Sequence, residues 1–275
     1  MIIRIHTPTF PLNEYINSFI YYDGLDPVHQ MDRFLPDGNT ELIINLTEKP
    51  QHIYHNETLE EIQSCRQAWV SGIRTQPITI PSGKGCKMVI VAFKKGKAYP
   101  FYPLPMNELT DFVVEADLVF GRSILNLRYQ LLATSSIDRI FCLVERFLLQ
   151  QARHALPSDS ITECVEYAVS SITSQPNQLS LWQLSDQIGY SQKHFISLFK
   201  KQVGVAPKQY LKIMRFQKAI LAIEKDMSMH WNDLALQNGF YDQAHFINEF
   251  RAFSGFTPGE YVKRKSDLLN YIPVA

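Results

Sequence analysis

The feature that most constrains the fold of this chain is a residue pattern that occurs twice in its C-terminal third. The first copy reads WQLSDQIGYSQKHFISLFKKQVGVAPKQY, and the second reads WNDLALQNGFYDQAHFINEFRAFSGFTPGEY. Phe195 and Phe246 are 246 − 195 = 51 positions apart, whereas Gly189 and Gly239 are 239 − 189 = 50 apart. One residue is therefore inserted in the turn of the second copy, and both copies are expected to fold in the same way.

Each copy has the residue types of a helix-turn-helix. A small residue four positions before the turn glycine lets the second helix pack closely, and the glycine adopts a left-handed conformation that larger residues resist. A Ser or Asp after the turn can cap the free amides of the next helix, and apolar residues then recur at helical spacing. In order, these positions are Ser185, Gly189, Ser191, Phe195 and Phe199 in the first copy, and Ala235, Gly239, Asp242, Phe246 and Phe250 in the second.

The second helix of such a unit enters the major groove, where outward residues near its N-terminus reach base edges. Lys193 could contact guanine, whereas Gln243 and Asn248 suit adenine. Ile196 and Ala244 could contact a thymine methyl group. These side chains could instead form the solvated surface of an ordinary helical hairpin. The repetition of the whole pattern favours DNA recognition over that alternative.

The second copy, GFYDQAHFINEFRAFSGFTPGEY, resembles the signature of the AraC/XylS family of bacterial transcription regulators, and the resemblance covers about residues 165–263. It implies a seven-helix DNA-binding domain whose two recognition helices enter adjacent major grooves on one face of the DNA. It also implies seven base-facing residues: Lys193, Ile196 and Ser197 in the first recognition helix, and Gln243, Ala244, His245 and Asn248 in the second.

Basic residues are concentrated in the first copy, because no Asp or Glu occurs between Gln187 and Ile223. Contacts from such residues to DNA phosphates would make binding steeply salt-dependent. A solubilising surface is the alternative, and Arg215 could be a structural partner inside the domain. The predicted phosphate contacts are Lys200, Lys201, Lys208 and Arg251.

A long helix is predicted from Pro207 to about Lys225, since Pro suits the first turn and apolar residues follow at helical spacing. Its roughly 19 residues would span about 28 Å, which is less than the ~34 Å between successive turns of one groove. Bound DNA should therefore be modestly bent. The predicted DNA-binding domain covers residues 158–265, with helix-turn-helix units at about 181–202 and 231–253.

Residues 1–155 are predicted to form a sensor or dimerisation domain, β-rich to about residue 105 and helical over 107–155. Its short segments rich in Ile, Val and aromatic residues favour a barrel or sandwich, and the family resemblance implies a cupin-like barrel. These segments are MIIRI, SFIYYD, ELIINL, AWVSGI, QPITI and CKMVIVAF. The turn Leu35–Gly38 resembles one found in a sensor subgroup of the family. The predicted fold class is α+β multidomain: a β-rich, cupin-like barrel with trailing helices, then an all-α domain with two helix-turn-helix units.

The helical segment from Ile137 to about Gln151 carries an apolar face that must be buried. That face could pack on the barrel or on a second chain, so a homodimer is one prediction. Residues 152–160 are the predicted linker. The tail DLLNYIPVA is expected to be loosely held.

Tyr99, Phe101 and Tyr102 lie in the stretch GKAYPFYPLP and could line an effector pocket. The favoured interpretation is that this stretch is a rigid crossover packed on the sheet. His52 and His55 are the only paired histidines, too few for a metal site, so no metal and no cofactor are predicted. No catalytic residue and no enzyme are predicted either, because no nucleophile elbow, P-loop or dinucleotide fingerprint occurs.

The chain has 275 residues, of which 45% are apolar and 12% aromatic, enough for two cores. Its net charge is zero, so only the local basic run points to nucleic acid. The four cysteines lack zinc spacing, and no signal sequence or membrane span is apparent, which favours the cytoplasm.

The predicted function is a sequence-specific DNA-binding transcription regulator, either an activator or a repressor, controlled by a small molecule or partner that the N-terminal domain senses. The predicted partners are double-stranded DNA, a small-molecule effector and RNA polymerase. The alternative is a cupin-type metal-dependent or sugar-modifying enzyme fused to a DNA-binding domain.

Overall fold

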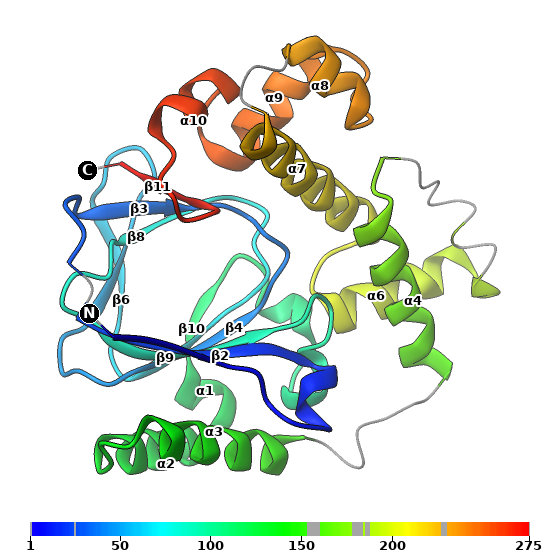
Figure 1. Ribbon diagram of the computed structural model, residues 1–275. Helices are drawn as coiled ribbons and strands as arrows, with labels where there is room; N and C mark the ends of the chain where they lie inside the picture. The colour runs from blue at the N-terminus through cyan, green and yellow to red at the C-terminus, as the bar shows by residue number, and fades with distance from the viewer. Residues whose placement is uncertain are drawn as a thin grey trace.

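The computed structural model describes residues 2–24, 26–152, 160–177, 184, 188–226 and 230–274. A β-rich N-terminal part with trailing helices is followed by a helical C-terminal part (Figure 1). This arrangement confirms the predicted fold class. The predicted domain boundary between residues 155 and 158 lies outside the described residues, as do residues 153–159 of the predicted linker.

The first antiparallel sheet has the strand order β1-β2-β9-β4-β7-β10. Alternation along its strands separates two faces: Leu42 and Ile44 point to one side, while Glu41 and Ile43 point to the other. The strands are β1 (Ile2–His6), β2 (Ile16–Asp23), β9 (Lys87–Phe93), β4 (Glu41–Asn45), β7 (Ala68–Ser71) and β10 (Val113–Glu115).

The second antiparallel sheet has the order β11-β3-β8-β5-β6 and faces the first across an interior cluster that includes Ile43, Ile53, Trp69 and Ile78. Its strands are β11 (Tyr271–Pro273), β3 (Met31–Phe34), β8 (Ile78–Pro81), β5 (Gln51–Tyr54) and β6 (Glu61–Cys65). In the described residues the two sheets stay separate, so the expected barrel is an open pair of facing sheets.

Helices α1 (Ala116–Phe120), α2 (Arg122–Leu132) and α3 (Ile137–Gln151) cover the outer face of the first sheet (Figure 1). Ile140, Val144 and Leu148 of α3 are buried in the same cluster as the outward residues of β4 and β9. Each such side chain contributes about 1.5–3 kcal/mol when fully buried. The apolar face of α3 therefore packs on its own chain, and a homodimer formed through this face is not supported.

Two segments differ from the prediction. Residues 107–115 were expected to be helical, but they form the end of the short 3-10 turn η3 (Met106–Glu108), a loop and the strand β10. The β-branched residues Val113 and Val114 pair with the free edge of β7. This strand pairing is favoured over a helix, although the apolar residues here recur at helical spacing. The C-terminal tail is not loosely held, because Tyr271–Pro273 pairs with β3.

The C-terminal part consists of α4 (Ser160–Ser174), α6 (Gln192–Val203), α7 (Pro207–Lys225), α8 (Trp231–Gln237), α9 (Gln243–Ser254) and α10 (Pro258–Arg264). Helix α7 has the predicted bounds and 19 residues. Among the described residues no helix combines the length and apolarity needed to cross a membrane.

The two parts share a packed interface. Leu35, at the end of β3, is fully buried in the cluster formed by α6, α7 and α9. Gln217 of α7 donates from Nε2 to the backbone oxygen of Pro36 at 2.7 Å and to Asn270 Oδ1 at 2.9 Å. Thr110 Oγ1 donates to the backbone oxygen of Gly204, beyond the end of α6, at 2.7 Å. The Leu35–Gly38 turn and the end of α6 thus fix the helical part on the sheets.

Candidate nucleic-acid interface

The two sequence copies build the same aromatic core. In the first, the ring centroids of Phe195 and Phe199 are 5.8 Å apart and those of Phe199 and Tyr210 are 5.7 Å apart. In the second, the corresponding distances are 5.7 Å for Phe246 and Phe250 and 5.5 Å for Phe250 and Tyr261. All four contacts are edge-on, which is the favoured geometry for aromatic pairs. The repeat in the sequence is therefore a repeat of the packing that holds each recognition helix.

The turns before α6 and α9 are also equivalent. Gly189 and Gly239 each have a φ of 74°, in the left-handed region that favours glycine. The side chain of Ser191 accepts a hydrogen bond from the backbone N–H of His194 at 3.4 Å, and Asp242 Oδ1 accepts one from His245 at 2.7 Å. Both side chains cap their helices. The small residue expected at Ser185 lies outside the described residues.

The seven predicted base-facing residues lie on the outer surfaces of α6 and α9. Ile196 is half-buried and the other six are exposed: Lys193, Ser197, Gln243, Ala244, His245 and Asn248. His245 is partly engaged within its own unit, since its ring packs edge-on against Phe240 and its Nε2 lies 3.7 Å from Glu249 Oε1. Gln243, Ala244 and Asn248 therefore form the freer part of the second surface.

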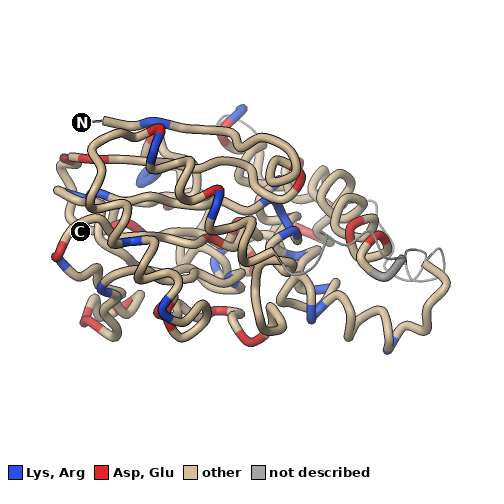
Figure 2. Tube along the Cα trace, turned by 90° about the horizontal axis from the view of Figure 1, so that it is seen from below, with Lys and Arg blue, Asp and Glu red and all other residues tan. Residues whose placement is uncertain are grey.

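The four predicted phosphate contacts, Lys200, Lys201, Lys208 and Arg251, are all exposed. Lys201 differs from the rest because its Nζ lies 5.8 Å from the centre of the Tyr99 ring, in the N-terminal part. Arg215 has the structural role that was one of its two predicted roles, since its Nε donates to the backbone oxygen of Pro176 at 2.8 Å. Figure 2 shows basic and acidic residues interspersed over the N-terminal part, in keeping with a net charge of zero.

Glu249 sets the position of the second recognition helix relative to the long helix α7. Its Oε1 accepts a hydrogen bond from Lys212 Nζ at 2.5 Å, and its side chain is only 16% exposed. Glu224 makes the equivalent connection from α7 to α10, accepting from Tyr261 at 2.8 Å and from Lys265 at 2.6 Å. Sequence reasoning missed both carboxylates. The two pairs Lys212–Glu249 and Glu224–Tyr261 have the same separation of 37 residues, and this regularity is the one sequence feature that they share.

The predicted effector residues are divided by the structure. Phe101 and Tyr102 are both part of the core beneath the first sheet, in agreement with the crossover interpretation. Tyr99, in the 3-10 turn η2 (Tyr99–Phe101), and Tyr102 line a cavity of about 180 Å³ together with Lys97 and Glu166. Burial raises the pKa of the Tyr102 hydroxyl, which has no hydrogen-bond partner among the described residues.

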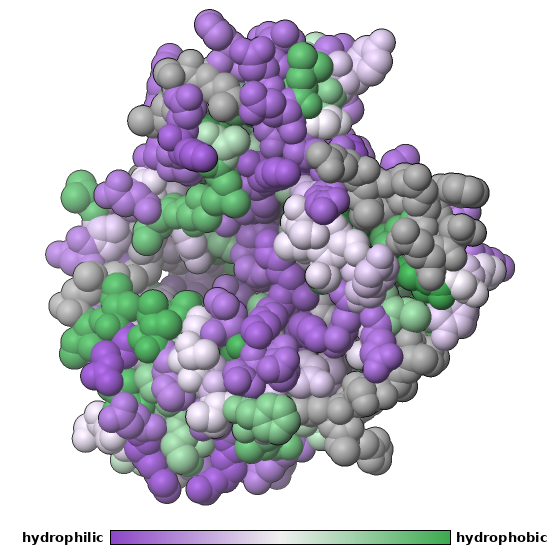
Figure 3. Space-filling model, turned by 45° about the vertical axis from the view of Figure 1, so that its right-hand side comes forward, coloured by the Kyte–Doolittle hydropathy of each residue, from purple (hydrophilic) through white to green (hydrophobic). Residues whose placement is uncertain are grey.

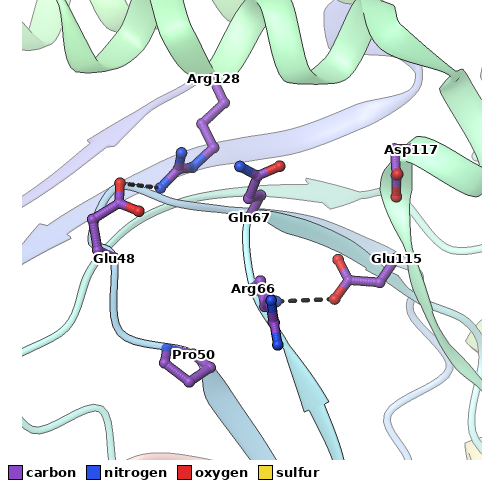
Figure 4. Close-up of a pocket in the computed structure, with 7 residues that line it drawn as sticks. All are labelled: Glu48, Pro50, Arg66, Gln67, Glu115, Asp117 and Arg128. Carbon is purple, nitrogen blue, oxygen red and sulfur yellow. Dashed lines mark hydrogen bonds and ion pairs between the residues drawn. The ribbon is translucent and has the colours of Figure 1, made fainter.

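A polar surface depression of about 620 Å³ lies where α2 meets the end of β4 (Figure 4). Arg128 donates to the backbone oxygens of Asn45 and Thr47 at 2.8 and 2.9 Å and to Glu48 at 3.0 Å. Glu115 accepts from the backbone N–H of Arg66 at 2.9 Å. The contacts of Arg128 hold α2 to the end of β4, and the contact of Glu115 joins β10 to the turn before β7.

The paired histidines have separate partners. His52 Nδ1 lies 3.0 Å from Glu61 Oε2, whereas His55 Nδ1 accepts from the backbone N–H of Thr58 at 3.2 Å. No group of three or more potential metal ligands occurs within the described ranges.

Comparisons with known proteins give two separate family matches, one in each part of the chain. Residues 184–264 match a family described as a helix-turn-helix domain, and residues 4–115 match one described as a domain of unknown function (DUF6597).

Two curated relatives match part of the chain. An uncharacterized HTH-type transcriptional regulator of Staphylococcus aureus (strain MSSA476) is 36% identical over 84 residues, which are 30% of this chain and 11% of that protein. A regulator of the same description from Haemophilus influenzae is 26% identical over 129 residues, 43% of each chain. The match thus spans about a tenth of the first relative and less than half of the second.

Among solved structures, ToxT from Vibrio cholerae is similar over 89% of this chain and 96% of that one, with a TM-score of 0.45 and 10% identity. A second ToxT structure, from Vibrio cholerae O395, is similar over 89% of this chain and 95% of that one, with a TM-score of 0.43 and 11% identity.

Proposed function

We propose that this chain, whose residues 184–264 are a helix-turn-helix domain of the AraC type, is a sequence-specific DNA-binding transcription regulator. The observation that carries the proposal is the pair of equivalent helices α6 and α9, with matching aromatic cores and matching N-caps. Both helices present exposed polar side chains near their N-termini, where recognition helices contact bases.

Helix α7 sets the spacing between the two helix-turn-helix units. Its 19 residues span about 28 Å, so the two recognition helices are held nearly one groove turn apart. The ion pair of Lys212 with Glu249 fixes α9 to α7, and the buried Phe216 packs on both Phe250 and Phe253. A rigid arrangement of this kind favours two half-sites about 10 base pairs apart on one face of the DNA.

The chemistry of each side chain indicates whether it would contact bases or phosphates. Asn248, Gln243 and Lys193 are proposed to read base edges, whereas Lys200, Lys208 and Arg251 are proposed to contact phosphates. Lys201 is proposed to contribute less than the other lysines, because it also lies against Tyr99. The N-terminal part is proposed to sense a small molecule. The whole protein is proposed to act with RNA polymerase in the cytoplasm.

The test is a selection of binding sites from random duplex DNA with the full chain, followed by gel-shift titrations of variants. Asn248→Ala should weaken binding to the selected site by about 5- to 150-fold, equivalent to about 1–3 kcal/mol. It should also relax the sequence preference at one base pair. Lys200→Ala should weaken all sequences alike and should reduce the slope of log affinity against log salt by about 0.9.

Asn126→Ala, on the exposed side of α2, and Lys49→Ala are matched controls far from both recognition helices, and both should bind like the wild type. If selection enriched no sequence, or if Asn248→Ala left both affinity and base preference unchanged, the proposal would fail.

A further inference from the structure

The space between the two sheets is lined by side chains that are only partly buried, although sheets cover it on both sides. These side chains come from both sheets and are mostly apolar: Tyr22, Phe34, Ile80, Ile90 and Val113. Close packing would bury them fully, so they border a hollow. Figure 3 shows the surface hollowed on one side of the molecule, at the level of the space between the sheets.

Glu41 is the one carboxyl group on the inner face of β4, in the middle of the first sheet between β7 and β9. Protein atoms surround it, yet it keeps accessible surface, which means that it faces the hollow. Among the described residues its carboxyl group has no hydrogen-bond or ion-pair partner. An enclosed carboxyl group without a partner is costly unless it is neutral or receives one from a ligand.

The electrostatic surroundings of Glu41 are acidic. Burial and, to a smaller extent, the charge of the nearby Asp37 together raise the pKa of Glu41 to about 8. Burial raises the pKa of Asp37 and the charge of Lys95 opposes that rise, whereas the pKa of Glu41 responds to burial and to Asp37. Tyr22, Tyr102 and Tyr271 are the other titratable groups close enough to feel the charge of Glu41. A negative ligand would therefore be repelled, and a positive one attracted.

Aromatic rings complete the walls. The rings of Phe34 and Tyr271 lie 4.9 Å apart, and Tyr22 donates from its hydroxyl to Met88 Sδ at 3.0 Å, so its ring is held in place. An aromatic face beside a carboxylate is a favourable environment for an organic cation, because the ring quadrupole and the carboxylate attract the same charge.

We propose that the hollow between the two sheets binds a small organic ammonium ion with an apolar body, the ammonium group at Glu41 and the body against Ile80, Ile90 and Val113. The proposal deepens the sensing role given to the N-terminal part and rests on it for its biological meaning. The binding event itself requires no DNA.

Proton release gives the proposal a specific signature. With a pKa of about 8, the Glu41 carboxyl is about 90% protonated at pH 7. An ammonium ion stabilises the carboxylate and lowers that pKa, so about 0.9 proton should leave for each ligand bound at pH 7. A neutral ligand of the same shape would leave the proton in place.

The experiment is a calorimetric titration of the full chain with n-alkylamines from butylamine to octylamine, at pH 7, in two buffers of different ionisation enthalpy. One amine should bind per chain with release of close to one proton, and the n-alcohols of equal length should bind at least tenfold more weakly. Amine affinity should also rise between pH 6 and pH 8. Glu41→Gln should abolish the proton release and weaken the amine at least tenfold.

Glu108→Gln, an exposed carboxylate at η3, is the matched control and should bind amines as the wild type does. Circular dichroism should establish that Glu41→Gln is folded; if it is not, the pH dependence and the alcohol comparison in the wild type decide alone. The proposal is overturned if no amine binds, if the alcohols bind equally well, or if no proton is released. Asn248→Ala should keep full amine binding, so failure of this proposal and failure of the DNA-binding proposal are separate results.

Discussion

Gly38 offers the sharpest test of how the two parts are held together. This residue has a φ of 83°, and a Cβ placed on it would lie 2.4 Å from Met214 Cε of α7. Two costs follow for Gly38→Ala. The left-handed backbone costs a non-glycine residue about 1–2 kcal/mol, and forcing a methyl group into a packed contact adds typically 1–3 kcal/mol.

The second cost should fall near the low end of that range, since the end of a Met side chain adapts easily. It should not vanish, because Tyr210 and Ile213 lie 3.5 and 3.8 Å from the added Cβ and Met214 is only 3% exposed. The expected loss for Gly38→Ala is therefore about 2–3 kcal/mol of unfolding free energy.

Gly85→Ala is the matched control for this change. Gly85 has a φ of 67°, and no atom lies within 4 Å of its added Cβ, so only the backbone cost of about 1–2 kcal/mol applies. Urea denaturation followed by circular dichroism measures both variants. In the background of Met214→Ala, which makes room for the methyl group, Gly38→Ala should cost at least about 1 kcal/mol less than in the wild type. Equal losses for Gly38→Ala and Gly85→Ala, or strict additivity with Met214→Ala, would refute the contact.

Three other perturbations have defined outcomes. Thr257→Ala removes the capping box at α10 and should cost about 0.5–2 kcal/mol in thermal denaturation; an unchanged Tm would contradict it. The folded pKa of Glu41, about 8, lies above that of an unfolded carboxyl group. The wild type should therefore lose stability as pH rises from about 4.5 through 8, and Glu41→Gln should lose less. Equal losses of unfolding free energy in the two proteins between pH 5 and pH 9, measured by urea denaturation, would disprove this. Bound DNA should be modestly bent, because α7 spans about 28 Å; a phasing gel shift that reports straight DNA would exclude the bend.

Local patterns in the sequence were sufficient for the elements that depend on local spacing. The bounds of α7 follow from Pro207 and the apolar positions after it, and the N-caps of α6 and α9 from Ser191 and Asp242. The strands β1, β2, β4, β7, β8 and β9 also lie largely within the six segments predicted from Ile, Val and aromatic content.

The elements that the sequence did not reveal depend on partners distant in the chain. Strand β10 exists because the edge of β7 accepts it, and β3, β5 and β6 carry too many polar residues to stand out. The link between Lys212 and Glu249 joins residues on different helices, and nothing in the local pattern marks either as paired. The tail looks weakly structured until Tyr271 is placed opposite Phe34.

That last pairing indicates how a ligand in the hollow could affect the DNA-binding helices. Successive side chains of a strand point to opposite faces. Tyr271 of β11 lies on the side of Phe34 and the hollow. Ile272 beside it is fully buried in the cluster that contains Phe199 and Tyr210.

Strand β11 therefore contacts the hollow with one face and the helical core with the other. Its neighbour β3 has the same division, because Arg33 lies over the ring of Phe256, after α9, at 4.8 Å. A bound cation can shift the position of the helices only if it binds one arrangement of these strands more tightly than another. Since β3 and β11 contact both regions in this way, we expect Phe34 and Tyr271 to contribute to that difference in affinity.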